Sequence, residues 1–116
     1  MILVDTSVWV DHFRSGNAKL GELLADGVVL MHPFVVGELA CGTMRNRVRI
    51  LGDLQALPTS TLADHREVLR FVDTHRLWGR GIGWTDCHLL ASAQLSGCAL
   101  WTLDRPLRRA AAAIGL

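Results

Sequence analysis

Four acidic residues of this chain lie at the ends of apolar runs or within predicted helices, where a position on a solvated surface explains them poorly. Asp5 directly follows a short aliphatic run at the N-terminus, and Asp104 ends a second apolar run. Asp86 opens one predicted helix, and Glu38 lies inside another. In an α/β sheet, the carboxyl ends of parallel strands and the first turns of the following helices share one edge. We therefore expect all four carboxylates to converge at that edge.

Such a convergence has a direct electrostatic consequence. Two carboxylates about 4 Å apart repel each other by roughly 4 kcal/mol at an effective dielectric constant of ~20. Several together therefore take up protons or bind a cation, and oxygen ligands without histidine or cysteine favour Mg²⁺ or Mn²⁺. Such an ion can polarise a phosphoryl oxygen and lower the pKa of its bound water. This chemistry suits the hydrolysis of phosphodiester bonds.

Each acid taken alone also has a simpler structural explanation. Asp5 and Asp86 are both suitable N-caps for the helices that follow them. Asp104 precedes an arginine and a proline, a sequence that is typical of a turn or a cap. Glu38 is expected to share a helix face with apolar neighbours, where a buried charge needs a cation or an arginine partner. Spacing alone therefore leaves a metal site and four separate structural roles both open.

The elements that must position these acids follow from the apolar pattern. We expect buried strands at residues 2–4, 28–31 and 98–103, because short apolar runs between turn residues are typical of parallel strands. A short edge strand is expected within residues 57–60. Helices are predicted over residues 7–14, with Ser7 as one possible cap, around 20–24, and over 33–42, 46–56, 64–78, 85–97 and 106–113. Asp64 and Glu67 resemble a capping box at the start of the helix over residues 64–78, and Trp78 is expected on its apolar side. Strands that alternate with helices indicate an α/β fold around a short parallel sheet.

The composition bounds the class of protein. With 116 residues and 12.7 kDa, the chain has the length of one domain, which we expect to span residues 1–116. The net charge is only +1, so no strong overall field attracts nucleic acid, although eleven of the twelve basic residues are arginine. Three widely spaced cysteines argue against a disulfide framework or a zinc site. With neither a signal peptide nor an apolar run of membrane-spanning length, we expect a cytoplasmic protein without a membrane partner.

Four segments of the sequence together resemble a known family. They are Leu3-Val4-Asp5-Thr6-Ser7, Val36-Gly37-Glu38-Leu39, Asp86-Cys87-His88-Leu89-Leu90-Ala91 and Leu100-Trp101-Thr102-Leu103-Asp104. In this order and at these separations they resemble a PIN domain, and more narrowly a VapC-type toxin of a bacterial toxin–antitoxin pair. The similarity extends over essentially the whole chain.

The resemblance implies a flavodoxin-like, three-layer α/β/α sandwich with the activity of a Mg²⁺-dependent endoribonuclease. It also implies a homodimer and a cognate VapB-type antitoxin that holds the enzyme inactive. The four acids described above match the acidic positions of the family, and Asp5 and Asp86 are the expected direct ligands of Mg²⁺ or Mn²⁺. Thr6 and Thr102 match the hydroxyl residues beside the first and last acids. The expected reaction is in-line attack of a metal-activated water on an RNA phosphodiester, which leaves a 5′-phosphate and a 3′-hydroxyl.

A glycine-rich segment, Gly79-Arg80-Gly81-Ile82-Gly83, superficially resembles a dinucleotide-binding loop. It follows a predicted helix rather than a strand and lacks the full spacing of that motif. We expect instead a flexible loop that borders the site, with Arg80 as a contact to RNA phosphate.

Two other classes of function remain open. A non-catalytic module that binds RNA or protein would not need all four acids. A receiver or phosphatase domain also gathers acids around Mg²⁺. Receivers, however, use a lysine near the last strand, whereas the only lysine, Lys19, is expected far from any strand end. Dehalogenase-like phosphatases need an aspartate at the position that Ser7 occupies here.

Overall fold

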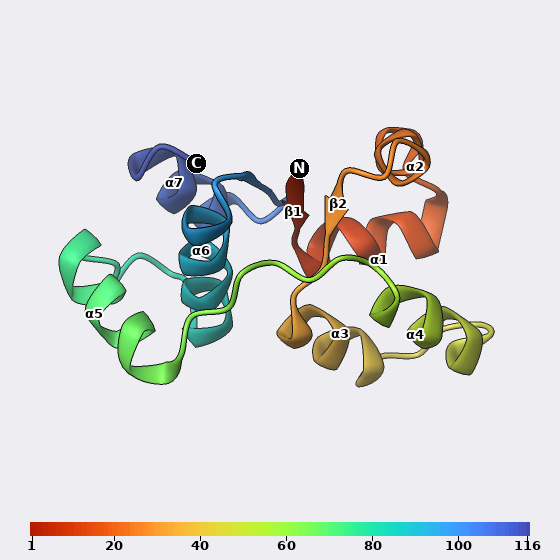
Figure 1. Cartoon of the computed structure of the whole chain (residues 1–116), viewed down its shortest axis with the longest axis horizontal. Helices are drawn as coiled ribbons and strands as arrows, with labels where there is room; N and C mark the ends of the chain where they lie inside the picture. Colours follow the sequence, from red (N-terminus) through yellow and green to blue (C-terminus); the bar gives the residue numbers. More distant parts are fainter.

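Three short parallel strands form the central sheet of the computed structural model, which describes residues 1–116 (Figure 1). The strands are β1 (Ile2–Val4), β2 (Val29–Leu30) and β3 (Ala99–Trp101), and their order in the sheet is β2-β1-β3. Leu3 of β1 lies opposite Leu30 of β2 and Leu100 of β3. Because β1 is the central strand, Asp5 leaves the sheet in the middle of its carboxyl edge.

All three predicted strands are present, although the outer two are shorter than expected. β3 ends at Trp101, and the next residue turns toward the end of β1, where the Thr102 hydroxyl donates a hydrogen bond to Asp5. The edge strand expected at residues 57–60 is reduced to a single parallel bridge between Met31 and Thr59. The prediction of an α/β fold around a short parallel sheet is confirmed.

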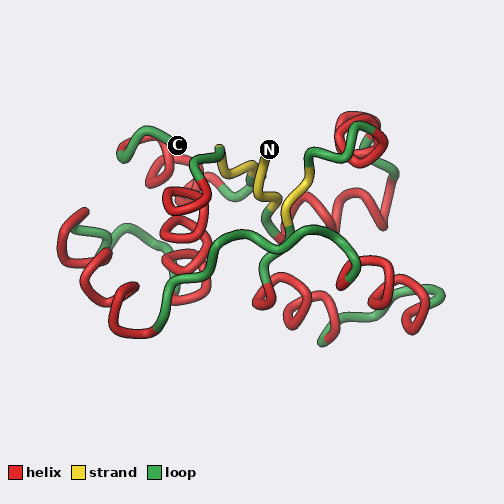
Figure 2. The backbone as a smooth tube through the Cα atoms, viewed as in Figure 1, coloured by secondary structure: helices red, strands yellow, loops and turns green.

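Seven helices connect and flank the strands (Figure 2). They are α1 (Thr6–Ser15), α2 (Ala18–Ala25), α3 (Pro33–Ala40), α4 (Arg47–Gln55), α5 (His65–His75), α6 (Trp84–Ser96) and α7 (Arg105–Ala113). The molecule measures 40 × 24 × 23 Å, with α5 at one end and α2 and α4 toward the other (Figure 1). None of these helices has both the length and the apolar character needed to cross a lipid bilayer.

Side-chain caps fix where several helices begin. Asp5, Asn17, Asp64 and Asp104 each accept a hydrogen bond from a backbone N–H in the first turn of α1, α2, α5 and α7. The capping box predicted for α5 is present, because the Glu67 side chain also accepts from the backbone N–H of Asp64. Two of the four candidate acids therefore serve as N-caps, and this role leaves part of each carboxylate free.

The helix α6 is the central helix of the core. Every residue from Cys87 to Ala93 is buried, and α6 packs against β1, β3 and α5. Leu89 and Leu90 are completely buried, and burial of a leucine side chain contributes about 1.5–3 kcal/mol. This packing fixes the first turn of α6, which carries Asp86, relative to the ends of the strands.

The end of α5 differs from its prediction. The predicted helix over residues 64–78 places Trp78 on its apolar side, but α5 ends at His75 and Trp78 is 63% exposed. Arg76 adopts a left-handed conformation with a φ of 52°, which stops the helix. Leu77 turns into the core instead and is 1% exposed.

Candidate active site

Asp5 lies at the centre of the candidate site and is 6% exposed. Its Oδ2 atom accepts hydrogen bonds from the Ser7 hydroxyl at 2.7 Å and the Thr102 hydroxyl at 2.8 Å. The backbone N–H of Ser7 also donates to this oxygen, at 3.4 Å. Because every hydrogen bond to the carboxylate converges on Oδ2, Oδ1 has no donor from the protein. Asp5 is therefore held rigidly by one oxygen and presents the other.

The same two hydroxyls join the ends of β1 and β3. The Ser7 hydroxyl accepts from the backbone N–H of Leu103 at 3.0 Å, and the Thr102 hydroxyl accepts from that of Asp104 at 3.0 Å. Each hydroxyl thus donates to Asp5 and accepts from the chain that leads into α7. This arrangement fixes Asp104 relative to Asp5.

Thr102, predicted beside the last acid, contacts both Asp104 and Asp5, and its supporting role stays a prediction. The contacts of Ser7 are not predicted by the sequence, which indicates only a possible helix cap at that position. The available signal was a hydroxyl residue two positions after an acid at a strand end, but its partners Thr102 and Leu103 are far away in the sequence.

Glu38 is placed by Thr6, whose hydroxyl donates to Glu38 Oε1 at 2.7 Å. The expectation that Glu38 is buried among apolar neighbours is wrong, because Glu38 is exposed. Of the three apolar neighbours one helical turn away, Phe34 and Cys41 are also exposed, and only Val35 is buried. Helical spacing defines a face but does not determine whether another element covers it. The contact with Thr6, at the start of α1, still brings Glu38 close to the end of β1.

Asp86 occupies the first turn of α6, where its Oδ2 accepts the backbone N–H of Gly83 at 3.1 Å. Burial raises the pKa of Asp86, and the carboxylates of Asp5, Asp104 and Glu38 raise it further, against the opposing effect of the Gly83 hydrogen bond. The charges of all three other acids therefore act on Asp86. The four predicted site residues lie near one another at the carboxyl edge of the sheet.

Asp104 caps α7 through Oδ2, which accepts from the backbone N–H of Leu107 at 3.1 Å. The four acids thus share one pattern, in which one carboxylate oxygen is bound by the protein and the other has no protein donor. No lysine or arginine neutralises them, because the only ion pair in the chain joins Arg49 to Asp53, at 4.0 Å.

The chemistry of these ligands fits a hard divalent cation, because all four supply only carboxylate oxygens. In the arrangement observed, however, no three acidic, histidine or cysteine side chains are positioned to hold one metal ion together. The structure therefore presents oxygen ligands around a shared edge rather than a complete coordination sphere.

Arg80 lies in the predicted loop after α5, and its contact with RNA stays a prediction, whereas Lys19 differs from its expected position. Arg80 folds back onto the end of α5, where its Nε donates to the carbonyl of Arg76 at 2.9 Å. Lys19 is not remote from the strands, because its Nζ lies 5.1 Å from the ring centroid of Trp101, the last residue of β3. It forms no ion pair with a site carboxylate, so it does not take the place of a receiver lysine.

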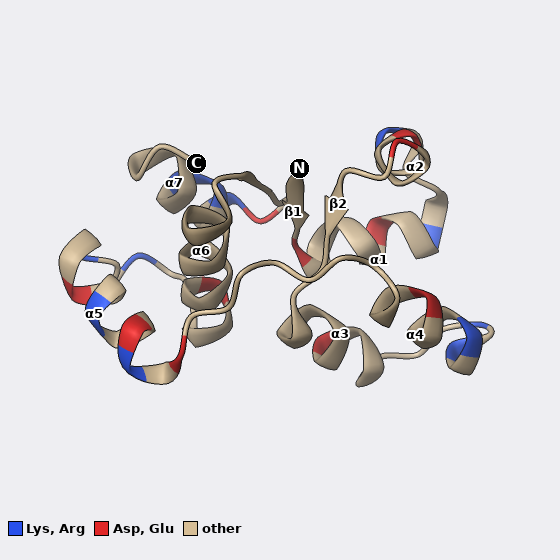
Figure 3. Cartoon of the chain, in the orientation of Figure 1, with Lys and Arg blue, Asp and Glu red and all other residues tan.

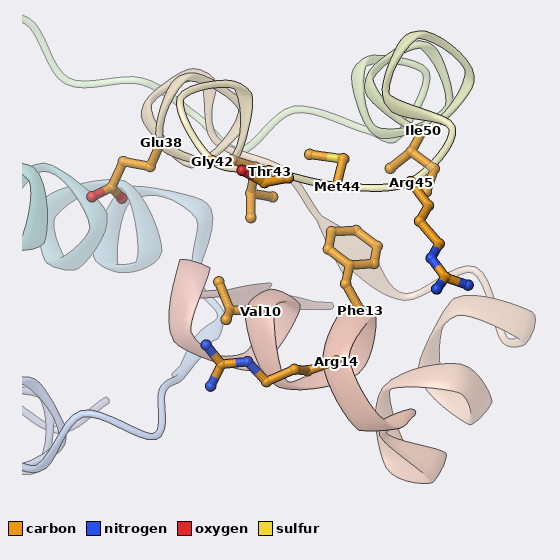
Figure 4. Close-up of a pocket in the computed structure, with 10 residues that line it drawn as sticks. Val10, Phe13, Arg14, Glu38, Gly42, Thr43, Met44, Arg45 and Ile50 are labelled. Atoms are coloured by element: carbon orange, nitrogen blue, oxygen red, sulfur yellow. The ribbon is translucent and has the colours of Figure 1, made fainter.

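A pocket of about 450 Å³ adjoins the candidate site between α1, α3 and the start of α4 (Figure 4). It is lined by Val10, Phe13, Arg14, Glu38, Leu39, Gly42, Thr43, Met44, Arg45 and Ile50. Figure 4 shows Phe13 pointing toward Met44 across the pocket, whereas Glu38 at one end points toward α6. The pocket therefore extends from Arg45 at one end to Glu38, one of the four acids, at the other.

The comparisons with known proteins agree with this fold. A family model described as the PIN domain matches residues 2–113. The protein named Ribonuclease VapC32 of Mycobacterium tuberculosis, in strains CDC 1551 / Oshkosh and H37Rv, is 48% identical, and the match covers the whole of this chain and 94% of that protein. The crystal structure of PAE2754 from Pyrobaculum aerophilum has a TM-score of 0.61 at 19% identity, covering 94% of this chain and 78% of that chain, which indicates a shared fold.

The chain belongs to the PIN domain family. The expected PIN-like α/β fold is confirmed by the match to the family model and by the solved structure. Within the family, the resemblance to the VapC type is confirmed by the full-length similarity to VapC32.

Proposed function

We propose that this chain is a divalent-metal-dependent endoribonuclease, the toxin of a VapBC-type toxin–antitoxin pair. One observation carries the proposal: four carboxylates share one edge of the sheet, each with one oxygen free of protein donors, and none has a cationic partner. A relative that is 48% identical over the whole chain is named a ribonuclease, which supports RNA as the substrate.

The roles of the residues follow from how each is held. Asp5 and Asp86 are proposed as the direct ligands of Mg²⁺, or of Mn²⁺, with Glu38 and Asp104 in support. A bound ion of this kind polarises a phosphoryl oxygen and lowers the pKa of a water molecule. The carboxylates would orient such a water for in-line attack on the phosphorus of an RNA phosphodiester and would accept its proton. The bond from phosphorus to the 3′ oxygen would break, and protonation of that oxygen would give a 3′-hydroxyl, with the phosphate left on the 5′ side.

Thr6 and Thr102 are proposed as positioning residues rather than catalytic ones. Thr102 holds Oδ2 of Asp5, and Thr6 holds Oε1 of Glu38, so in each case the second carboxylate oxygen remains available. Fixed ligands reduce the entropy lost when an ion and the substrate bind. The hydroxyls therefore act on the rate through the acids that they position.

The substitution Asp5→Asn tests the proposal. An asparagine keeps an acceptor oxygen for the Ser7 and Thr102 hydroxyls, so we expect the fold to be retained. Loss of the charge should lower RNA cleavage in Mg²⁺ by at least about 100-fold, a typical cost of removing a key electrostatic group. The exposed helix residue Asp73, changed to asparagine, is the matched control and should leave the rate unchanged. Full activity of Asp5→Asn would contradict the proposal.

The antitoxin is proposed to dock in the pocket between α1, α3 and α4 (Figure 4). Phe13, Leu39 and Met44 suit an apolar segment, and Arg14 and Arg45 suit acidic residues beside it. A segment bound there would also cover Glu38. We expect Phe13→Asp to prevent inhibition by the antitoxin while RNA cleavage persists. Inhibition equal to that of the wild type would contradict this docking site.

A homodimer acting on cytoplasmic RNA is also proposed. Phe34 and Trp84 are each 39% exposed, and their rings lie 4.5 Å and 4.7 Å from that of the buried His88, measured between centroids. A second copy would cover this aromatic surface, because large exposed apolar groups mark interaction sites. Sedimentation equilibrium should give twice the chain mass, with Trp84→Gln weakening the association. A monomeric wild type at micromolar concentration would contradict the dimer.

A further inference from the structure

A second, smaller pocket lies between the loop after α5 and the helix α7. Its volume is about 250 Å³, and it is lined by Arg80, Pro106, Arg109 and Ala110. No acidic side chain lines this pocket, and neither arginine forms an ion pair. Two arginine residues therefore line one small cavity that no acidic residue lines.

The first of these arginines is held in place by the backbone. Arg80 donates through Nε to the carbonyl of Arg76 at 2.9 Å and through Nη2 to that of His75 at 3.4 Å. A guanidinium has five N–H donors, so these two bonds leave the Nη1 donors unused. The side chain of Arg109 donates no hydrogen bond within the protein. The pocket thus combines one fixed arginine with one that is free to adjust.

The pocket lies between the two segments that carry Asp86 and Asp104. Arg80 is three residues before Gly83, whose N–H binds the Asp86 carboxylate, and Pro106 is two residues after Asp104. The loop packs closely on α7, because a Cβ atom at Gly81 would lie 3.6 Å from the Cβ of Pro106. Figure 3 shows basic segments in the loop between α5 and α6 and in α7.

We propose that this pocket binds a backbone phosphate of the RNA strand whose scissile bond lies at the four carboxylates. The inference rests on the proposed ribonuclease function and adds a binding subsite to it. A phosphate bound between two arginines that have no acidic partner would gain charge-assisted hydrogen bonds from both. Because the acidic edge itself repels RNA, a cationic subsite beside it supplies affinity that the carboxylates do not.

A phosphate contact positions a strand without reading its sequence. Arg80 and Arg109 therefore contribute affinity and register along the RNA rather than base preference. Their loss should raise the KM for RNA, while kcat at saturating RNA stays close to that of the wild type. This split separates a binding role from a role at the reacting atoms.

The test measures RNA binding in the Asp5→Asn background, where cleavage does not interfere. Arg109→Gln is the variant of choice because Arg80 also caps the end of α5. We expect its affinity for a single-stranded RNA to fall about fivefold at low salt, the upper end for an exposed ion pair. The slope of log K against log salt concentration should become shallower by about 0.7–1. Arg66→Gln, which removes the same charge from an exposed position on α5, is the matched control and should change neither quantity.

Each remaining outcome is decisive. An affinity and a salt slope for Arg109→Gln equal to those of Arg66→Gln would overturn the inference. If inorganic phosphate bound the wild type in an Arg109-dependent way while RNA affinity stayed unchanged, the pocket would hold only a free anion, which also overturns it. A wild-type chain that cleaves no RNA in Mg²⁺ but binds RNA through Arg109 would instead count against the proposed activity, so the two failures are distinguishable.

Discussion

Asp5 and Glu38 each accept a hydroxyl hydrogen bond of 2.7 Å, yet their surroundings differ. Asp5 is buried and shares its bound oxygen between Ser7 and Thr102, which also hold the chain after β3. Glu38 is exposed and depends on Thr6 alone. A hydrogen bond in a buried network is costly to break, whereas an exposed one is readily replaced by water. One side of the site is therefore preorganised and the other can adjust.

This difference separates the roles of the two sides. The buried side joins β1, β3 and α7, so its geometry is part of the fold. The exposed side lies on α3 at the end of the larger pocket, where a bound partner can reach Glu38 (Figure 4). We infer that the buried side determines the intrinsic geometry for a cation, and that the exposed side is the point at which a partner protein influences it.

The largest effect is expected on the buried side. Thr102→Val keeps the side-chain shape but removes a donor to Asp5 and an acceptor for the N–H of Asp104. Leaving such groups unsatisfied should lower the free energy of unfolding by about 1–3 kcal/mol. RNA cleavage should fall by at least tenfold, on the order of 1.4 kcal/mol, since Asp5 loses one anchor. Urea unfolding measures the free energy of unfolding, and initial rates measure RNA cleavage. Thr74→Val, at an exposed position, is the control. If neither quantity changed in Thr102→Val, the buried network would not hold the site.

A smaller, pH-dependent effect on the free energy of unfolding is expected at Asp86. Its pKa is raised mainly by burial, and the acids of the buried side and Glu38 of the exposed side both raise it further. A raised pKa means that the folded, metal-free protein binds this proton more tightly than the unfolded chain. The resulting stability is present below the ordinary aspartate pKa of 3.8 and is lost as pH rises through the higher folded value.

Asp86→Asn should remove this dependence. In the absence of metal, the variant should be at least as stable as the wild type at neutral pH, where the wild type carries the unfavourable charge. Urea unfolding between pH 4 and 7 should show a flatter profile for the variant. A variant clearly less stable than the wild type at pH 7 without metal would contradict the convergence of the four acids.

The smallest effect is expected on the exposed side. Thr6→Val removes the hydroxyl that binds Glu38, but water can replace it. The free energy of unfolding should change by no more than about 0.5 kcal/mol, and cleavage should fall only a few-fold. If Thr6→Val proved as damaging as Thr102→Val in the same assays, the distinction between the two sides would be lost.

The sequence predicted the features of the site that depend on neighbouring residues. The aliphatic run before Asp5 gives a buried strand, and the following hydroxyl residues begin a helix, because both signals lie within a few positions. The capping box of Asp64 and Glu67 is equally local. The alternation of strands and helices predicts a parallel sheet with one shared carboxyl edge. From that edge follows the prediction that four acids, distant in the sequence, lie near one another.

Features that depend on distant contacts were not predictable in this way. The second function of Ser7 needs Thr102 and Leu103, which are close only once β1 and β3 pair. The exposure of Glu38 depends on which elements cover α3, and helical periodicity does not contain that information. Trp78 lies outside the core because the chain reverses at Arg76, a residue without the usual preference for a left-handed conformation.

The rate of RNA cleavage by the wild-type chain, measured as Mg²⁺ is restored after excess EDTA, tests the central claim most directly. Four carboxylates without a cationic partner should support no cleavage in EDTA, and cleavage should return with saturable dependence on Mg²⁺. The same titration of Asp5→Asn should give no recovery, while Asp73→Asn should match the wild type. RNA cleavage that continues undiminished in EDTA would contradict the role assigned to the four acids.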